Sequence, residues 1–324
     1  MIEERNMRRK LLLTVFLIAI MLLSSITYAL AQSTADSIMD RFHSMPDIEY
    51  NGTNYSMRTR LTTILLAGTD HRGENANSYR GHRNGGQADF ILLIVIDDKN
   101  DTVFPIYLNR DLMTDITVLN IIGLEAGTAR GQICLQHGYG DGRERSCELL
   151  KDTVSRTLLN IPIDHYAVMS MDGIKALNDA LGGVQVTLEE DFSYYDPEMT
   201  IGKTVTLEGD QAELYLRYRY NVGEETSVSR FPRQKQYLLN MFDMLSENKK
   251  LVPVVFKAID PYLVTDMSRG KMTNISNLVL SYEILPVGEI EGESMIGSNG
   301  FNEFHADTDS IMRVVLDAFY EPAG

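Results

Sequence analysis

Short apolar runs alternate with segments of helical spacing along most of the chain after residue 60. Three runs of seven residues, at 62–68, 90–96 and 102–108, have the length and composition of buried strands. The polar stretch at 97–100 lies between the second run and the third and has the character of a turn. We therefore predict three strands, of which the second and third form an antiparallel hairpin.

Apolar residues three and four positions apart predict helices at 147–159, 173–181, 232–248 and 307–320. Segments of strand character are interspersed with them, at 166–171, 184–188 and 282–288. Strands that alternate with helices are typical of an α/β domain built on a central sheet. We expect this domain to cover 61–250, with 251–324 as a C-terminal extension packed on the same domain.

The first 31 residues have the pattern of a membrane anchor. Four basic residues within 1–10 precede an uncharged, mostly apolar run at 11–31, and about 20 such residues cross a bilayer. Basic flanks stay in the cytoplasm, so 1–10 is predicted to be a cytoplasmic tail and the main body extracytoplasmic. The small residues of Ala29-Leu30-Ala31 leave a cleaved signal peptide as the alternative. Residues 32–60 are predicted to form a linker and a helix.

Charge and cysteine content narrow the choice of partners. The formal net charge of −15 argues against a nucleic-acid partner, which requires a broad basic surface. Cys134 and Cys147 are the only cysteines in the sequence, and outside the cytoplasm two cysteines can form a structural disulfide. The sequence leaves open whether they do.

An arginine cluster stands out against this acidic background. Arg217 and Arg219 lie two positions apart, so an extended backbone would point both the same way. Arg230, Arg233 and Gln234 share one face of the helix predicted at 232–248 and its preceding turn. Guanidinium groups suit phosphate oxygens. The alternative is a surface ladder of ion pairs with acidic neighbours, namely Glu213, Glu224 and Glu225.

Polar clusters at 68–72, 87–89 and 109–111 lie at the ends of the three predicted strands. The hairpin would bring Asp89 beside Arg110, and a first strand parallel to the third would add Asp70 at the same edge. Two carboxylates can hold a hard cation such as Mg²⁺, with Mn²⁺ as a second candidate. Carboxylates, a metal ion and arginines are the parts that phosphoryl transfer requires.

These motifs, taken in order, resemble the LytR-CpsA-Psr family of bacterial membrane-anchored enzymes that attach glycopolymers to peptidoglycan. The resemblance covers about 62–245 and rests on Gly-Thr-Asp-x-Arg at 68–72, Asp89, Arg110-Asp111, Asp164-His165-Tyr166, Leu181-Gly182-Gly183-Val184, Leu216-Arg217-Tyr218-Arg219 and Arg230-x-x-Arg233-Gln234. Each motif alone is weak, but seven in order are specific.

The resemblance implies a three-layer α-β-α fold with a central mixed sheet and a Mg²⁺-dependent phosphotransferase activity. The donor would be a glycopolymer on a polyprenyl diphosphate, and the acceptor would be peptidoglycan. An apolar cavity between sheet and helices would take the prenyl tail. By position, the metal ligands would be Asp70 and Asp89, the catalytic residues Arg110, Asp89 and Asp111, and the diphosphate-binding residues Arg72, Arg217, Arg219, Arg230, Arg233 and Gln234.

The chain departs from the family pattern where members commonly carry Arg-Ser-Asp, because it has Gln87-Ala88-Asp89. One cation of the family pattern is therefore missing, or is supplied by another arginine. Two other functions stay open at this point: a non-catalytic envelope protein that binds polyprenyl phosphate, and a lipid-diphosphate pyrophosphatase. Retention of both the carboxylates and the arginines favours the transferase.

Overall fold

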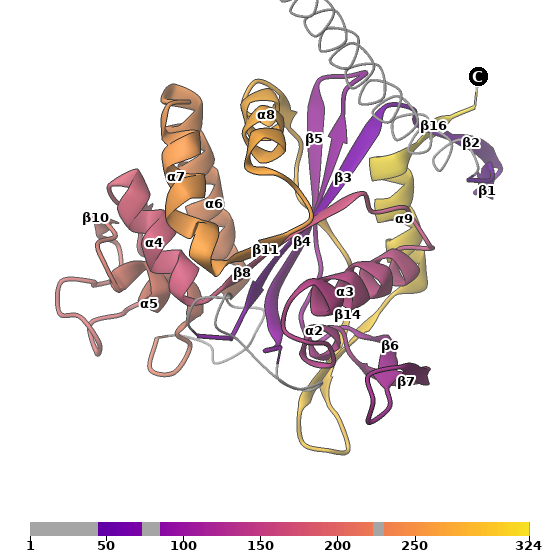
Figure 1. Cartoon of the computed structure of the whole chain (residues 1–324), viewed down its shortest axis with the longest axis horizontal. Coiled ribbons are helices and arrows are strands. Elements are labelled where there is room, and N and C mark those ends of the chain that lie inside the picture. The colour runs from indigo at the N-terminus through magenta and orange to yellow at the C-terminus, as the bar shows by residue number, and fades with distance from the viewer. Residues whose placement is uncertain (1–44, 73–84, 223–229, 324) are drawn as a thin grey trace, which may run out of the picture. The chain divides into compact units, whose positions relative to one another are not determined.

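The computed structural model describes residues 45–72, 85–222 and 230–323 (Figure 1). The chain divides into two compact units, Met1–Arg60 with Pro322–Gly324 and Leu61–Glu321. The described part of the first unit contains a β-hairpin of β1 (Ile48–Tyr50) and β2 (Thr53–Met57). The second unit contains the central sheet and every candidate site residue.

The hairpin in the first unit replaces part of the segment that we predicted as a linker and a helix. Asn51 and Gly52 form its turn with φ of 50° and 76°. Asn-Gly is the preferred pair for a two-residue turn with both φ values positive, because its twist matches that of the strands. The remainder of the predicted segment up to residue 44, and the predicted anchor at 11–31, lie outside the described residues. Among the helices that are described, none has the length and apolarity needed to cross a membrane.

A mixed sheet of seven strands organises the described part of the second unit. Its strands, in spatial order, are β11 (Leu263–Thr265), β8 (His165–Ser170), β3 (Leu61–Thr69), β4 (Ala88–Asp97), β5 (Thr102–Tyr107) and β12 (Glu283–Ile284), with β13 (Gly288–Glu289) also paired to β5. The three strands predicted first and the hairpin between the second and third are confirmed.

The direction of the strands creates one polar edge. β4 is antiparallel to both of its neighbours, β3 and β5, while β8 is parallel to β3. The ends of β3 and β5 and the start of β4 therefore lie at the same edge of the sheet, which we call the Asp89 edge. This is the arrangement that the polar clusters predicted.

A β-bulge at the Asp89 edge determines which way Asp89 points. Gly68 pairs with Phe90 and Thr69 with Ala88, so Asp89 is the extra residue of β4. Alternation along a regular strand would place Asp89 on the face opposite to Phe90. A bulge re-aims side chains locally, and both Asp89 and Phe90 line the same cavity.

Helices cover both faces of the sheet (Figure 1). One face is covered by α4 (Asp172–Leu181), α5 (Gln211–Arg217), α6 (Arg230–Glu247), α7 (Leu251–Ile259) and α8 (Arg269–Val279), with the short η2 (Asp260–Tyr262) after α7. The other face is covered by α2 (Leu135–Gly138), α3 (Glu144–Thr157) and α9 (Thr308–Phe319). The predicted α/β fold with a central mixed sheet is confirmed.

Three small two-stranded ribbons complete the unit. They are β6 (Met113–Leu119) with β7 (Glu125–Gln132), β9 (Gln185–Thr187) with β10 (Thr204–Thr206), and β14 (Gly292–Ile296) with β15 (Asn302–Ala306). The last strand, β16 (Tyr320–Pro322), ends at Pro322, which belongs to the first unit. The first ribbon follows Arg110-Asp111 directly, so its position is tied to the Asp89 edge.

The two glycines of the Leu181-Gly182-Gly183-Val184 motif follow α4 and have different structural roles. Gly182 ends the helix with φ 80°, and a Cβ there would meet no atom within 4 Å. Gly183 has φ 93°, and a Cβ there would lie 2.7 Å from the carbonyl oxygen of Leu207. Backbone directly after β10 thus approaches Gly183 so closely that only glycine fits.

This difference predicts unequal costs for two adjacent substitutions. Gly182→Ala adds only the left-handed backbone penalty and should lower the free energy of unfolding by about 1–2 kcal/mol. Gly183→Ala adds a collision to that strain and should cost roughly 3 kcal/mol or more. Urea unfolding of both variants measures the difference, and equal costs would contradict the close approach.

Candidate active site

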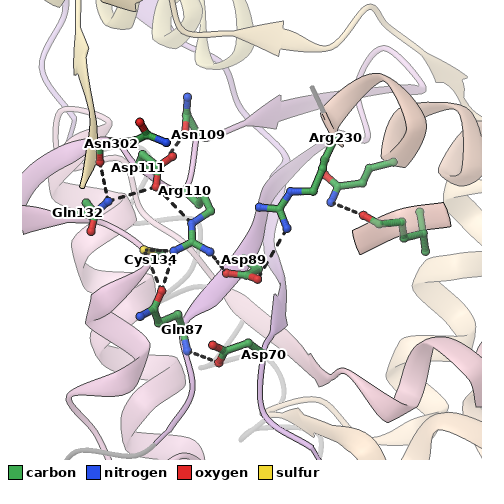
Figure 2. Close-up of polar contacts among 12 residues, drawn as sticks. Asp70, Gln87, Asp89, Asn109, Arg110, Asp111, Gln132, Cys134, Arg230 and Asn302 are labelled. Carbon is green, nitrogen blue, oxygen red and sulfur yellow. Dashed lines mark hydrogen bonds and ion pairs between the residues drawn. The ribbon is translucent and has the colours of Figure 1, made fainter. Parts of the chain in front are cut away.

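The guanidinium of Arg110 is the centre of a polar network at the Asp89 edge (Figure 2). Its Nη1 donates to Asp89, and its Nη2 donates to Oε1 of Gln87 at 2.6 Å and to Sγ of Cys134 at 3.4 Å. Its Nε lies 3.3 Å from Oδ1 of Asp111. Burial works against the charge, but Cys134 and the two carboxylates hold the pKa of Arg110 above its ordinary value. Arg110 is therefore a fixed, fully charged group.

Asp111 supports Arg110 from behind. Its side chain is buried, and its Oδ1 also accepts from Nε2 of Gln132 at 3.2 Å. The same Gln132 nitrogen donates to the carbonyl oxygen of Asn302 at 2.7 Å, which ties β15 to the site. No local pattern in the sequence marks Gln132 or Asn302, because only the folded chain brings these distant segments together.

Asp70, directly after β3, pairs with Gln87, directly before β4. Its Oδ1 accepts from the backbone N–H of Gln87 at 2.6 Å, and its own N–H donates to the carbonyl oxygen of Gln87 at 3.0 Å. Gln87 thus contacts both Asp70 and Arg110, two groups assigned to the site. The position where the family commonly has arginine is occupied here by a neutral side chain that accepts from Arg110.

Asp70 and Asp89 are the two carboxylates that could hold a divalent cation. Asp70 directly follows β3 and Asp89 is the second residue of the adjacent β4, and Figure 2 shows both at the same edge. The described residues contain no group of three or more His, Cys, Asp and Glu side chains that could hold a metal ion. Two carboxylates suffice where substrate phosphates and waters complete the shell, as is usual for Mg²⁺. The donor set fits such an ion.

Arg230 faces Asp89 from the opposite side to Arg110. Its Nη1 lies 3.8 Å from Oδ2 of Asp89, and its side chain is 6% exposed. Burial lowers the pKa of Arg230, and the positive charges of Arg110 and Arg219 contribute in the same direction. Its buried Nε has no hydrogen-bond partner within the described ranges. A buried guanidinium with an unused donor is an observation that points to a missing anionic ligand.

Arg217 and Arg219 are arranged differently from the prediction. Arg217 is the last residue of α5, so the extended backbone predicted from 217 to 219 begins only at Tyr218. Arg217 lines the cavity and pairs with Glu213, with 2.8 Å between Nη1 and Oε1. Arg219 lies over the ring of Tyr220, with 5.4 Å to the ring centroid. The end of α5 therefore falls between two groups that an extended strand would have aligned.

Arg233 has a structural position, as its contacts show. Its side chain is 2% exposed, and its Nη1 and Nη2 donate to the carbonyl oxygens of Tyr215 and Tyr218 at 2.7 and 2.8 Å. Its Nε lies 2.9 Å from Oε2 of Glu190. These donors satisfy carbonyls at the end of α5, which the helix leaves without partners. Arg233 therefore positions α5.

The two remaining predicted binding residues also differ from each other. Gln234 lines the cavity, and its Nε2 donates to the carbonyl oxygen of Leu216 at 3.3 Å. Arg72 has a 58% exposed side chain, which pairs with Asp172 at 3.0 Å and with Glu213 at 2.5 Å. Of the surface ladder that the sequence left as an alternative, the pair of Arg217 with Glu213 is present, while Glu224 and Glu225 lie outside the described residues. The structure brings Arg72 to this ladder and not to Asp89.

An apolar cavity of about 740 Å³ lies between the sheet and the helices α6, α7 and α8. Alternate residues of β3 and β4, including Leu66, Leu92 and Ile94, form its floor. Its polar lining comes from a few residues near the Asp89 edge, mainly Asp89, Arg217, Arg230 and Gln234. Close by, Phe231 stacks on Tyr107 with 3.7 Å between ring centroids. The cavity thus joins an apolar interior to a charged end.

The two cysteines are both free and buried. Cys134 contacts Arg110, and Sγ of Cys147 lies 3.9 Å from Nε2 of His137. The disulfide that the sequence left open is therefore absent, because each thiol is packed against a different partner.

The sequence of this chain is similar to that of a known protein family. The sequence matches the LytR_cpsA_psr family over residues 25–315. The chain belongs to this family. The predicted family and the predicted transferase class are both confirmed.

Curated relatives and solved structures agree on this assignment. The polyisoprenyl-teichoic acid–peptidoglycan teichoic acid transferase TagU of Bacillus mycoides is 25% identical over 87% of this chain and 88% of its own. TagU of Enterococcus faecalis is 30% identical over 66% of this chain and 64% of its own. The fold is similar to that of Bacillus subtilis TagV, with a TM-score of 0.61, 20% identity and coverage of 80% of this chain and 95% of TagV. TagT bound to LI-WTA also gives a TM-score of 0.61, at 20% identity, over 80% of this chain and 89% of TagT.

Substitutions of Arg233 and Arg217 can be compared to test whether Arg233 stabilises the fold more than Arg217 does. Arg233→Gln leaves Glu190 and two carbonyl groups without partners and should lower the free energy of unfolding by about 3–5 kcal/mol. Arg217→Gln removes one partly exposed pair and should cost about 1 kcal/mol or less. Thermal and urea unfolding compare the two variants. A small loss for Arg233→Gln would show that it does not hold α5.

The cysteine arrangement predicts protection from alkylation. Burial is the main cause that raises the pKa of Cys134, to about 12, and it raises that of Cys147 as well. At neutral pH both remain thiols, and the thiolate is the reactive form. Mass spectrometry after N-ethylmaleimide treatment should find no adduct on the native protein and two on the unfolded protein. Two adducts that appear only after reduction would instead reveal a disulfide.

Proposed function

We propose that this protein is a Mg²⁺-dependent phosphotransferase that moves a glycopolymer from a polyprenyl-diphosphate carrier to peptidoglycan. The observation that carries this proposal is the apolar cavity that ends at Asp89, Arg217 and Arg230. A prenyl diphosphate has the same division, with an apolar chain attached to a compact anion. The volume of about 740 Å³ lies within the range of small-molecule sites, roughly 300–1,000 Å³.

The reaction would break the phosphoanhydride bond of the diphosphate and form a new phosphoester bond. A sugar hydroxyl of peptidoglycan attacks the phosphorus that carries the glycopolymer, and the bond to the second phosphate breaks. The products are a glycopolymer–peptidoglycan phosphodiester and polyprenyl phosphate, with the hydroxyl proton released. Charge grows on the transferred phosphate and on the leaving group, so fixed cations at both places stabilise the transition state.

Arg110 is suited to act on the transferred phosphate. It is held by Asp111, Gln87 and Cys134, so it needs little reorganisation when charge develops. Arg230 and Arg217 lie at the charged end of the cavity and would hold the phosphate attached to the prenyl chain. Arg219 would add a further positive charge near Arg230.

Asp89 pairs with both Arg110 and Arg230 and would have to release one of them when the diphosphate binds. It would then accept the proton of the acceptor hydroxyl or, with Asp70, hold the metal ion. A bound Mg²⁺ would neutralise phosphate charge and orient the diphosphate. Arg72 stays outside this group in our proposal, because it belongs to the ladder at Glu213.

The names of the relatives support a teichoic acid as the polymer class. The predicted anchor at 11–31 would hold the protein in the cell membrane as a single-pass protein. Its main domain would then lie on the extracytoplasmic side, where lipid carrier and peptidoglycan are both accessible. No nucleic-acid partner forms part of this proposal.

The proposal predicts separate losses of turnover and of binding. Asp89→Asn and Arg110→Gln should lower the release of polyprenyl phosphate by about 100-fold or more, since each removes a preorganised charge at the reacting centre. Arg217→Gln should weaken binding of the lipid diphosphate by about tenfold, the effect of one charge-assisted hydrogen bond. The assay uses the purified chain, a polyprenyl-diphosphate-linked sugar, Mg²⁺ and peptidoglycan.

Arg269→Gln is a suitable control, because its side chain is 63% exposed on α8, pairs with Asp260 and lies outside the cavity lining. It should retain full turnover. Tight binding without turnover in any acceptor mixture would reject the enzyme, and release of polyprenyl phosphate without transfer to peptidoglycan would show hydrolysis. Removal of divalent cations with a chelator tests the metal separately, and unchanged turnover would exclude it.

A further inference from the structure

Two hairpin tips expose large aliphatic and aromatic side chains that the proposed reaction does not use. The loop between β6 and β7 carries Ile121, Ile122 and Leu124, which are 92%, 67% and 61% exposed. The loop between β14 and β15 carries Phe301, which is 65% exposed, after Ile296, which is 68% exposed. We call these five residues the apolar tips. Clustered exposed apolar residues mark an interaction surface more often than chance.

The first tip is built to present its side chains outward. The side-chain oxygen of Asn120 accepts from the backbone N–H groups of Ile122 and Leu124, each at 3.0 Å. The backbone of Asn120 and Leu124 closes the loop with a further hydrogen bond of 2.8 Å. The loop therefore has its polar groups satisfied internally while its aliphatic groups face solvent.

The second tip is built in the same way. Asn299 accepts from the N–H of Phe301 at 3.0 Å, and Gly297 pairs with the carbonyl oxygen of Phe301 at 2.8 Å. Gly300 has φ 80°, which allows the tight turn. Phe301 and Ile296 are therefore held at the end of the ribbon.

Both tips belong to ribbons that start at the candidate active site. β6 begins two residues after Asp111, and the N–H of Phe304 in β15 donates to the carbonyl oxygen of Asp111 at 2.8 Å. Next to Phe301, the carbonyl of Asn302 accepts from Gln132, which also donates to Asp111 (Figure 2). The second tip thus lies immediately beside the site. The first lies at the end of a strand of seven residues, roughly 23 Å long.

We propose that the apolar tips insert into the surface of the lipid bilayer and hold the Asp89 edge at the depth of the lipid head groups. This inference rests on the proposed function, in which the donor is a lipid whose diphosphate lies at the membrane surface. Narrow projecting tips suit a bilayer better than a protein partner. A stable protein interface buries about 800 Å² on each side, whereas insertion into a bilayer requires no complementary shape.

The length of chain between the predicted anchor and the second unit is compatible with the lipid bilayer as the surface that the tips contact. If the predicted anchor ends at residue 31, twenty-nine residues separate it from Leu61, where the second unit begins. Twenty-nine extended residues span roughly 100 Å at most. The second unit therefore stays within reach of the bilayer, and the tips would determine which of its edges faces the lipid.

The charges of the protein distinguish insertion of the tips from electrostatic adsorption of the protein to the bilayer. The charged neighbours of the first tip pair with one another, Arg130 with Asp115 at 3.8 Å and Arg145 with Glu125 at 2.5 Å. The chain carries a net charge of −15, which opposes binding to anionic lipids. Insertion would depend on apolar contact, so added salt should leave it unchanged or strengthen it by screening the repulsion.

The absence of tryptophan from the sequence allows a direct test. The full chain with Ile121→Trp or Phe301→Trp is reconstituted into phosphatidylcholine vesicles, with or without bromine on the lipid chains. Interfacial side chains lie about 5–10 Å into the boundary, so bromines should quench roughly half of the fluorescence at either tip. Tyr194→Trp is the matched control, since Tyr194 is 72% exposed on a different loop.

Quenching at positions 121 and 301 with none at 194 would support the proposal. Equal quenching at all three positions, or none at either tip, would overturn it. A blue-shifted emission at the tips that depends on protein concentration and not on bromine would identify a second protein copy as the occupant, which also overturns it.

A second arm measures turnover. Ile121→Ser combined with Phe301→Ser should lower transfer from a full-length prenyl donor in vesicles by roughly tenfold, because two large apolar side chains lose their burial. Transfer from a short-chain, water-soluble donor should not change. Equal loss with both donors would overturn the docking role. Failure of the unmodified protein on the soluble donor would reject the proposed reaction, and the quenching result would stand independently of it.

Discussion

The carboxylate of Asp89 lies between the guanidinium groups of Arg110 and Arg230, and the site is arranged around this shared ion pair. Asp111 also pairs with Arg110, so two carboxylates balance the two guanidinium groups where solvent is partly excluded, and an entering anion would replace Asp89 on one of them. Screening is weak at such a place, so an anion that enters gains more than it would at the surface. The unused Nε of Arg230 agrees with such a ligand. Because the apolar cavity ends at the same point, one constraint accounts for both the head group and the tail of the proposed donor.

The strands and the Asp89 edge could be predicted from the sequence because their signals are local. Runs of seven apolar residues gave the strands, and the turn at 97–100 gave the hairpin that brings Asp89 beside Arg110. The bulge at Asp89 was not predictable, since no local pattern marks it and it depends on pairing with β3. Without this bulge, alternation would have turned Asp89 away from the cavity. Correct strands therefore did not yet establish the direction of the most important side chain.

The arginines illustrate the same limit. Residue type and helical spacing placed Arg230, Arg233 and Gln234 on one buried face, which the structure has. Spacing could not show that Arg233 satisfies the carbonyls at the end of α5, because those carbonyls belong to a segment 15 and 18 residues away. It also could not show that α5 continues through Arg217. Contacts between distant segments therefore distinguish the arginines that line the cavity, Arg217 and Arg230, from Arg233, which holds the end of α5.

The departure at Gln87 follows from the same balance of charge. Arginine at this position would add a third cation within reach of Asp89 and could not accept a hydrogen bond from Arg110. Glutamine accepts from Arg110 through its side chain and donates to Asp70 through its backbone. It therefore keeps Arg110 in place without competing for Asp89. The site consequently has one cation fewer than arginine would give it, and Arg110 has a further hydrogen-bond acceptor that helps to fix its position. For the proposed reaction a fixed Arg110 favours catalysis, because stabilisation of the transition state depends on preorganisation.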